Sequence, residues 1–524
     1  MLKINCMIGI ITIFGSTVVA NAQSLSSNQL NNVSSNNDLY MSHNKIDPLG
    51  SSESLNSSLE IKAELLFEQI EKNSIPISLE KALQTAIKTN PQLTQAYREI
   101  QATQWEKIAI RRQWIPTLNL ESYPLYGGYY QTTYIDSLTS TPIDGTSAEN
   151  GNVNFSNTIL LSPIIGLQWT FFDAKRGASI AAKSSTIQQQ KFLFNSSARS
   201  LALNVSRAYY NVQGAQILVK QYQKLYQTSR KALDAVTAQM NIGVLDIGVS
   251  SQIATQYYTN LNNYYNAVSN LVDQSAELAS LLNFSNETYI LASDPMAPNL
   301  DWKLSLSESI IRAKAFNDEI LAAYADVNSL NWQAKSLMNA YYPELFIFGQ
   351  GQMYQYRGVQ SAPLGNDDAY SSYNISNKQY VANIGIGATW SFDGGVSAAN
   401  SMSFRKKAQA AEAKQESTLL SVVSNIKSAY GTYQALNNEL ESVEKGLDAA
   451  KLNQEVTEAK YGLGLSDVTT LVQSLQLYSS AIQQQVSTLI NLNSAVAELY
   501  RYTSIWPSNT VNAFQAREST LSKD

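Results

Sequence analysis

The chain has almost none of the side chains that most often carry out chemistry in proteins. Among its 524 residues there is one cysteine, Cys6, and one histidine, His43. With so few, no disulfide within the chain, no Cys or His metal site and no Ser/His/Asp or Cys/His catalytic set can be assembled. His43 lies in a tract of Ser and Asn, where we expect it to be solvated. The sequence therefore predicts a protein that is not an enzyme and holds neither a metal nor a cofactor.

The chain also lacks a strong excess of positive or negative charge, and long apolar runs are rare. The 37 Lys and Arg residues are balanced by 42 Asp and Glu residues and form no basic cluster, so we do not expect a nucleic-acid partner. Beyond the N-terminal segment no run of about 18 apolar residues occurs, which argues against a membrane-spanning helix. The chain does have 30 tyrosines, with 44% apolar and only 15% charged residues. This composition suits a surface that faces both lipid and water.

The first residues have the pattern of a secretory signal. A lysine is followed by an apolar run from Cys6 to Ala20 and by a cleavage site of small residues that ends at Ala22. We expect residues 1–22 to be a signal peptide, whose removal leaves a mature chain without cysteine. Residues 23–75 are then a Ser/Asn-rich extension that we expect to be flexible, because few of its side chains can be buried. Its role stays open.

The rest of the chain shows a duplication. Residues at the head of the first half return 227 positions later in the second: Ser78, Leu79, Asn90, Tyr97, Trp105 and Pro116. Farther along, the offset becomes 221 positions for Trp169, Gly243, Asp246 and Gln252. A constant offset over so many residues indicates two copies of one unit. We expect the first structural repeat at residues 76–300 and the second at 301–504, followed by a C-terminal tail at 505–524.

Each repeat contains a long stretch without proline, at residues 164–294 and 364–506. Within each stretch we expect a helix of about 65 residues and about 100 Å, at about 175–240 and 396–461, because nothing in the sequence would end it earlier. The helices end at the turns MNIGVLD and YGLGLSD, where a glycine can adopt the left-handed conformation and an aspartate can cap the next helix. The returning segments complete two antiparallel helical hairpins, at about 175–283 and 396–503.

Before each long helix the sequence predicts a pair of strands. We expect them at about 116–130, 155–172, 343–356 and 379–392, with a long polar connection within each pair. In the second and fourth strands apolar residues alternate with small or polar ones, and aromatic residues stand at the helix end: Trp169, Phe171, Trp390 and Phe392. Strands with one apolar face, an aromatic membrane girdle and long loops at one end are typical of outer-membrane barrels. The alternative is half-buried strands of a soluble α+β domain.

Four strands cannot close a barrel alone. Because lipid offers no hydrogen-bond partner to a sheet edge, an open sheet of this size is excluded from a membrane. Two copies would give eight strands around a filled lumen, whereas three copies give twelve strands and room for water. The sequence thus predicts an α+β membrane protein. We expect a homotrimeric 12-stranded β-barrel, with four strands per chain, continued by a long periplasmic α-helical barrel.

Several segments carry a resemblance to a known family. They are SLEKALQTAIKTNPQL and RRQWIPTLNL at the head of the first half, the strand ends LQWTFFD and ATWSFDGG, and the turns IGVLD and YGLGLSDV. From about Ile77 to Ser504 the chain resembles the TolC-type outer-membrane efflux proteins, the outer membrane factors. The resemblance implies a homotrimer in the outer membrane of a Gram-negative bacterium, extending into the periplasm. It also implies a periplasmic adaptor, or membrane fusion protein, which links the channel to an inner-membrane pump.

The resemblance assigns roles to the helical tips and to the pore. The adaptor-docking tips would be formed by Gly243, Val244, Leu245, Gly464, Leu465 and Ser466. The gate or constriction would be formed by Tyr461, Asp467, Thr470 and Gln473. Well-known members hold the tips shut with an Arg and an Asp at positions that are Ser466 and Val249 here, and they have carboxylates at the positions of Thr470 and Gln473. The gate mechanism therefore stays open, and Asp467 is expected to act mainly as a helix cap.

Two functions from different classes follow from these features. The first is a passive outer-membrane exit duct of a tripartite efflux or type I secretion system, which exports small molecules or proteins with energy from the inner-membrane pump. The second is a trimeric structural or adhesive protein of coiled helices, with the β-barrel serving only as its anchor. The sequence names neither the exported substrate nor the adaptor and pump.

Overall fold

The structure is a computed structural model, which describes Leu65 and residues 67–122, 127–135, 152–243, 246–284, 288–300, 302–363 and 370–506. The chain divides into two units, Met1–Lys62 and Ala63–Asp524, and the described residues all belong to the second. The expected signal peptide, Cys6, His43 and most of the Ser/Asn-rich extension lie outside the described residues. The same is true of residues 507–524 in the expected tail.

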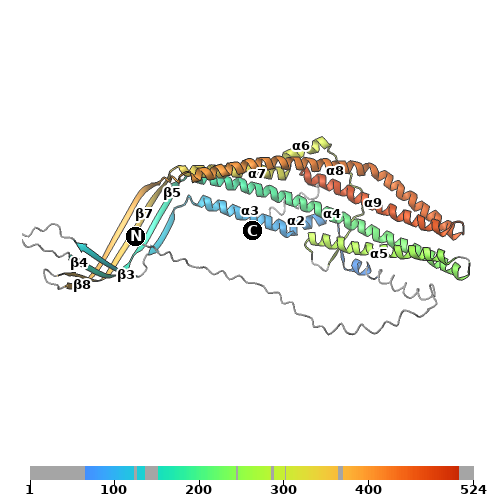
Figure 1. Cartoon of the computed structure of the whole chain (residues 1–524), viewed down its shortest axis with the longest axis horizontal. Coiled ribbons are helices and arrows are strands. Elements are labelled where there is room, and N and C mark those ends of the chain that lie inside the picture. The colour runs from blue at the N-terminus through green and yellow to red at the C-terminus, as the bar shows by residue number, and fades with distance from the viewer. Residues whose placement is uncertain are drawn as a thin grey trace, which may run out of the picture. The chain divides into compact units, whose positions relative to one another are not determined.

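The elements follow one another in two series of the same order (Figure 1). The first series is β1 (Ser74–Ile77), α2 (Leu79–Thr89), α3 (Pro91–Arg112), β2 (Thr117–Ser122), β3 (Gly127–Ile135), β4 (Asn152–Leu161), β5 (Pro163–Phe172), α4 (Ala174–Asn241) and α5 (Ile247–Leu281). The second is β6 (Tyr289–Ala292), α6 (Leu306–Phe316), α7 (Asp318–Met338), the 3-10 helix η1 (Asn339–Tyr341), β7 (Glu344–Pro363), β8 (Tyr370–Thr389), α8 (Val396–Gly462) and α9 (Val468–Tyr502). Across the described part of the chain, no helix has both the length and the apolar character that a membrane span requires.

The paired short helices of each series are joined by an asparagine. Asn90 ends α2 and begins α3, and Asn317 stands in the same place between α6 and α7. In both, the side-chain oxygen accepts hydrogen bonds from the N–H groups two and three positions later, at 2.9 and 3.3 Å. Asparagine is among the best residues for this purpose, since its short side chain satisfies N–H groups that have no partner inside the helix.

The long helices form two hairpins that pack on each other. The 68 residues of α4 correspond to about 100 Å of helix at 1.5 Å per residue. It packs against α5, α7 and α9, while α8 packs against α7 and α9. Tyrosines of the first hairpin are fully buried between the helices, for example Tyr257 and Tyr264. Where α4 meets α9, Gly214 permits a close approach, since an added Cβ would lie 2.6 Å from Ile490 Cδ1.

The strands before α4 and α8 form one antiparallel sheet. β2 pairs with β5 and β3 with β4, both β5 and β4 pair with β7, and β7 pairs with β8. In the region of the strand expected at 116–130 the structure has β2 and β3, and residues 123–126 between them lie outside the described residues. The strand expected at 155–172 is divided into β4 and β5 at Ser162. In this order β2 and β3 share one edge of the sheet, and β8 forms the other.

The last two strands are longer than the sequence predicted. β7 and β8 pair without a break from Glu344 opposite Thr389 to Pro363 opposite Tyr370. Residues 357–363 and 370–378, which were expected in a loop, belong to these strands. The prediction failed because this part of the sequence is polar and has no hydrophobic alternation, whereas its backbone pairing continues without a break. The fourth strand also ends at Thr389, so Trp390 and Phe392 lie just after it and not within it.

The two faces of the sheet differ in chemistry near the helices. One face carries exposed apolar side chains, among them Leu118, Leu120, Ile165, Leu167, Trp169, Ile384 and Ile386. The register places mainly polar residues and glycines on the other face, among them Thr117, Asn119, Gly166, Gln168, Gln350, Gln352 and Asn383. Side chains alternate along a strand, so both faces arise from the same period of two in the sequence.

Candidate functional site

The turns at the ends of the long helices depend on glycine. Gly243 follows α4 with φ of +75°, and Gly464 follows α8 with φ of +70°. This left-handed backbone suits glycine, which has no Cβ to clash with the chain. Leu465 is 74% exposed and Ile242 is 75% exposed, so both tips present apolar side chains to solvent. Val244 and Leu245, which were expected in the first tip, lie outside the described residues.

Aspartates begin both returning helices. Asp246 accepts a hydrogen bond from the N–H of Ile247 at 2.7 Å, and Asp467 accepts one from the N–H of Thr470 at 2.7 Å. Hydrogen bonding by Thr470, through its side chain and then its backbone, lowers the pKa of the Asp467 carboxyl. The ionised form is thereby favoured, as is usual for a carboxylate at a helix N-terminus.

The expected gate residues occupy the second tip and the start of α9. The hydroxyl oxygen of Tyr461 is buried and forms no hydrogen bond with the described residues, and burial raises the pKa of this tyrosine. Thr470 and Gln473 are exposed and three positions apart, which places them on one face of α9. Ser466 and Val249, at the positions of the charged latch in better-known proteins, are both partly buried and uncharged.

Uncharged polar side chains join the two hairpins at some distance from the tips. The side chain of Gln476 donates to Gln256 at 3.1 Å, and Gln256 donates to Asn260 at 2.9 Å. Farther along, Gln483 donates to the hydroxyl of Tyr222. Both Gln256 and Asn260 are buried. The sequence held no signal for these contacts, because the partners across the hairpins are 220 and 261 positions apart.

The expected girdle residues lie where the sheet meets the helices. Trp169 and Phe171 belong to β5, with ring centres 6.2 Å apart, and Trp390 and Phe392 follow β8, with ring centres 5.0 Å apart. The exposed fraction is 60% for Trp390 and 72% for Phe392. Amphipathic and aromatic rings at this level of a sheet suit the boundary between lipid and water.

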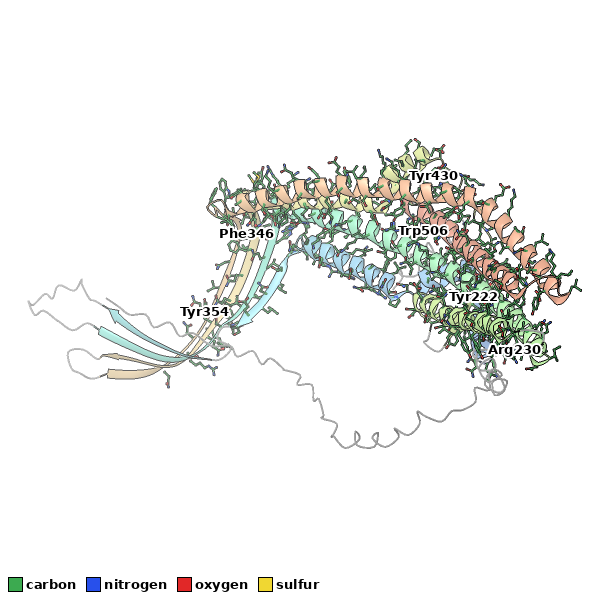
Figure 2. All side chains as sticks on the ribbon, turned by 45° about the vertical axis from the view of Figure 1, so that its right-hand side comes forward. Tyr222, Arg230, Phe346, Tyr354, Tyr430 and Trp506 are labelled. Atoms are coloured by element: carbon green, nitrogen blue, oxygen red, sulfur yellow. The ribbon has the colours of Figure 1, made fainter. Side chains whose placement is uncertain are left out.

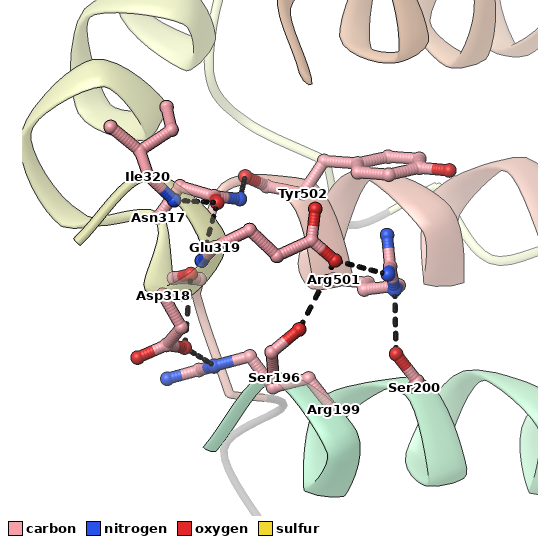
Figure 3. A network of polar contacts seen from close by, with 10 residues as sticks. Ser196, Arg199, Ser200, Asn317, Asp318, Glu319, Ile320, Arg501 and Tyr502 are labelled. Carbon is pink, nitrogen blue, oxygen red and sulfur yellow. Dashed lines mark hydrogen bonds and ion pairs between the residues drawn. The ribbon is translucent and has the colours of Figure 1, made fainter. Parts of the chain in front are cut away.

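A partly buried ionic cluster joins the ends of α7 and α9 to α4 (Figure 3). Arg199 donates to Asp318 at 2.8 Å, and the side chains of this pair are only 12% and 8% exposed. Beside it, Arg501 donates to Glu319 at 2.7 Å and to Ser200 at 3.0 Å. Desolvation by burial lowers the pKa of Arg199, while Asp318 raises it. The cluster anchors both halves of the chain at the ends of helices that lie away from the tips.

A sheet with one apolar face, continued directly by long helical hairpins, is the arrangement expected of an outer-membrane channel component. Comparison with protein families agrees, because the model of the outer membrane efflux protein family matches residues 82–283 and 310–504. The chain belongs to this family, which confirms the resemblance noted in the sequence. The protein is located in the outer membrane and extends into the periplasm, and the family consists of channels rather than enzymes.

Individual relatives are distant in sequence and similar in fold. The outer membrane protein TolC of Escherichia coli (strain K12) is 22% identical over 366 residues, which is 66% of this chain and 71% of TolC. The outer membrane channel CmeC of Campylobacter jejuni has a TM-score of 0.64 at 14% identity, covering 84% of this chain and 89% of that one. The outer-membrane channel OprN has a TM-score of 0.63 at 15% identity, covering 81% and 89%. These structures show a shared fold.

Proposed function

We propose that the protein is a passive exit duct formed by three copies of the chain. The observation that carries this proposal is the pair of open sheet edges. In the described sheet, β8 is paired with β7 on one side, and β2 and β3 are paired with β5 and β4 on one side. In lipid each unpaired edge needs a partner, and copies of the same chain can supply it edge to edge. The six strands of the described sheet fill four positions across it, because β2 and β3 lie end to end and so do β4 and β5. Three copies would then give a closed barrel of twelve strand positions that leaves room for water.

The duplication supports a continuous wall below the barrel. Both series of elements end in a hairpin of similar dimensions, with 68 and 35 residues in α4 and α5 and 67 and 35 residues in α8 and α9. Three copies would then arrange six equivalent hairpins around one axis. We assign residues 76–300 and 301–504 to two structural repeats, preceded by the signal peptide and the Ser/Asn-rich extension.

The tips are the proposed docking surface for a periplasmic adaptor. Exposed leucines and isoleucines at the two glycine turns offer apolar contact area that a partner can cover, Leu463 and Leu465 each being 74% exposed. Opening would then separate the second hairpin from the first. In this chain the separation breaks neutral contacts such as that of Gln476 with Gln256, in place of a charged latch.

The duct supplies a path and no energy. Export of small molecules or of proteins would be driven by an inner-membrane pump that reaches the duct through the adaptor. The family membership favours this role over the structural or adhesive alternative, since efflux is what the family model describes.

The test is reconstitution of the purified protein in a planar lipid bilayer. A duct conducts ions in discrete steps, and a strain without the protein becomes sensitive to toxic compounds. A membrane-anchored adhesive trimer does neither. Insertion into the bilayer without any conductance, together with unchanged sensitivity of the deletion strain, would refute the proposal.

A further inference from the structure

Two phenylalanines interrupt the polar face of the sheet. Phe346 and Phe348 lie two positions apart on β7, opposite Gly387 and Gly385 of β8. The register places them on the same face as Gln350 and Gln168, while Ile347 between them belongs to the apolar face. Their ring centres are 6.2 Å apart, at an angle of 49°. Phe348 is 37% exposed, although aromatic side chains on a water-facing surface are usually covered.

Each of the two rings packs over a glycine of the neighbouring strand. A Cβ added to Gly387 would lie 2.4 Å from the ring of Phe346, and one added to Gly385 would lie 2.9 Å from the ring of Phe348. The rings thus rest against backbone that only glycine leaves open. Each ring therefore occupies the space that a side chain at the glycine would fill. The pair forms an aromatic surface that is partly open to solvent, since Phe348 is 37% exposed.

On the neighbouring strand β5, the residues opposite the two phenylalanines are polar and uncharged. Gln168 lies opposite Phe348 and Thr170 lies opposite Phe346 on β5. The carboxylate of Glu344, two positions before Phe346, is paired with Lys175 at 2.5 Å. No net charge therefore arises from this ion pair beside the rings. A ligand here would gain its contact from the aromatic faces and from amide and hydroxyl groups at the side.

We propose that Phe346 and Phe348 form a binding site for planar aromatic groups of the exported molecules. This inference rests on the proposed duct, in which the polar face lines the lumen. The two phenylalanines lie where the strands meet the long helices, as the label of Phe346 shows (Figure 2). In a closed barrel only water and cargo reach this face. Three copies would place three such pairs at one level of the lumen, where a passing planar ring can contact an aromatic face of a subunit.

The chemistry selects flat aromatic cargo over other cargo of similar size. Aromatic rings contact one another in offset or edge-to-face arrangements, which gain free energy beyond that of burial alone. The same faces attract organic cations. An aliphatic ammonium ion has the charge but no ring. Comparing it with an aromatic cation therefore separates the ring–ring contact from the attraction of a cation to the aromatic faces.

The test measures how long single molecules block the ion current of the reconstituted duct. Ethidium, a planar aromatic cation, is compared with tetraethylammonium, which has no aromatic ring. In the double variant Phe346→Leu/Phe348→Leu the apolar cover of the glycines remains while the aromatic faces are lost. We expect the ethidium blockade to become about three to ten times shorter, and the tetraethylammonium blockade to shorten by a smaller factor, because that ion loses only its attraction to the aromatic faces and no ring stacking.

Ile347→Leu is the matched control, because this residue lies between the two phenylalanines on the opposite face. It should leave both blockades as in the wild type. If the double variant does not assemble, Phe348→Leu alone should shorten the ethidium blockade by a smaller factor. Equal ethidium blockades in the wild type and the assembled variants would refute the aromatic binding site but not the proposed duct. A wild type that does not conduct would refute the duct and, with it, the binding site.

Discussion

The indole nitrogen of Trp390 donates a hydrogen bond to the main-chain oxygen of Tyr341 at 2.9 Å. Trp169 makes the same bond, at the same distance, to the main-chain oxygen of Trp114. In both cases the tryptophan lies at the helix end of the sheet, and the acceptor lies just before the strand that enters it. Each bond therefore ties the end of one strand to the start of another, at the level where the sheet gives way to helices.

Replacing either tryptophan by phenylalanine keeps the aromatic ring and removes the donor. We expect Trp390→Phe and Trp169→Phe each to lower the free energy of unfolding in detergent by about 0.5–1.5 kcal/mol, the usual contribution of one hydrogen bond. Denaturant unfolding at a fixed protein concentration measures the change. Trp105→Phe serves as the control, because Trp105 is 64% exposed on α3. Equal losses in all three variants would show that the indole bonds add nothing.

The buried ion pair between Arg199 and Asp318 should be the most sensitive charged site. Asp318→Ala leaves the guanidinium buried without its carboxylate, which costs about 3–5 kcal/mol of unfolding free energy when a buried pair is broken. The exposed pair of Lys445 and Glu441 on α8 is the comparison, with side chains 75% and 77% exposed. Glu441→Ala should cost less than about 0.5 kcal/mol. Losses of similar size at the two sites would contradict the burial argument.

Acid should weaken the junction between β8 and α8 through Asp393. Hydrogen bonding by the Ser397 side chain first, then by its backbone and by the Tyr341 hydroxyl, lowers the pKa of Asp393 to about 2. A carboxyl with a depressed pKa stabilises the fold at pH values above its unfolded pKa of about 4, and this stabilisation is lost as the pH falls toward 2. The melting temperature should therefore fall more steeply between pH 5 and about pH 2 in the wild type than in Asp393→Asn. Parallel curves would assign the acid sensitivity to other groups.

Two glycines of α4 should respond to alanine in opposite directions. At Gly214 the added methyl group would meet Ile490 Cδ1 at 2.6 Å and Val486 Cγ1 at 2.9 Å, so these two side chains of α9 would have to shift. We expect a loss of about 1–3 kcal/mol in unfolding free energy, more than alanine gains from its helix propensity. At Gly177 no atom lies within 4 Å of the added group, so Gly177→Ala should stabilise by up to about 1 kcal/mol. A stabilising Gly214→Ala would mean that Ile490 and Val486 can make room for the methyl group without cost.

The sequence was informative where the signal is local. Absence of proline pointed to helices at 175–240 and 396–461, and the structure has α4 at Ala174–Asn241 and α8 at Val396–Gly462. The family resemblance, read from short segments at equivalent places in the two halves, is confirmed by the match over residues 82–283 and 310–504.

The sequence did not predict features that depend on strand pairing or on contacts between residues far apart in the chain. The far ends of β7 and β8 carry polar residues without a clear alternation, so their pairing up to Pro363 and Tyr370 left no hydrophobic signal. The contact of Arg199 with Asp318 joins residues 119 positions apart, and no periodicity in the sequence relates them. Phe346 and Phe348 did leave a signal, since they break the alternation of their strand. The sequence alone did not show that each phenylalanine lies opposite a glycine of β8, because that depends on the register of the two strands.

The account depends most on the number of chains that close the sheet. Native mass spectrometry of the protein extracted in mild detergent measures this number directly. The open edges at β2, β3 and β8 predict one species with the mass of three mature chains. A stable single chain, or a complex of two, would contradict the shared barrel and the export path built on it.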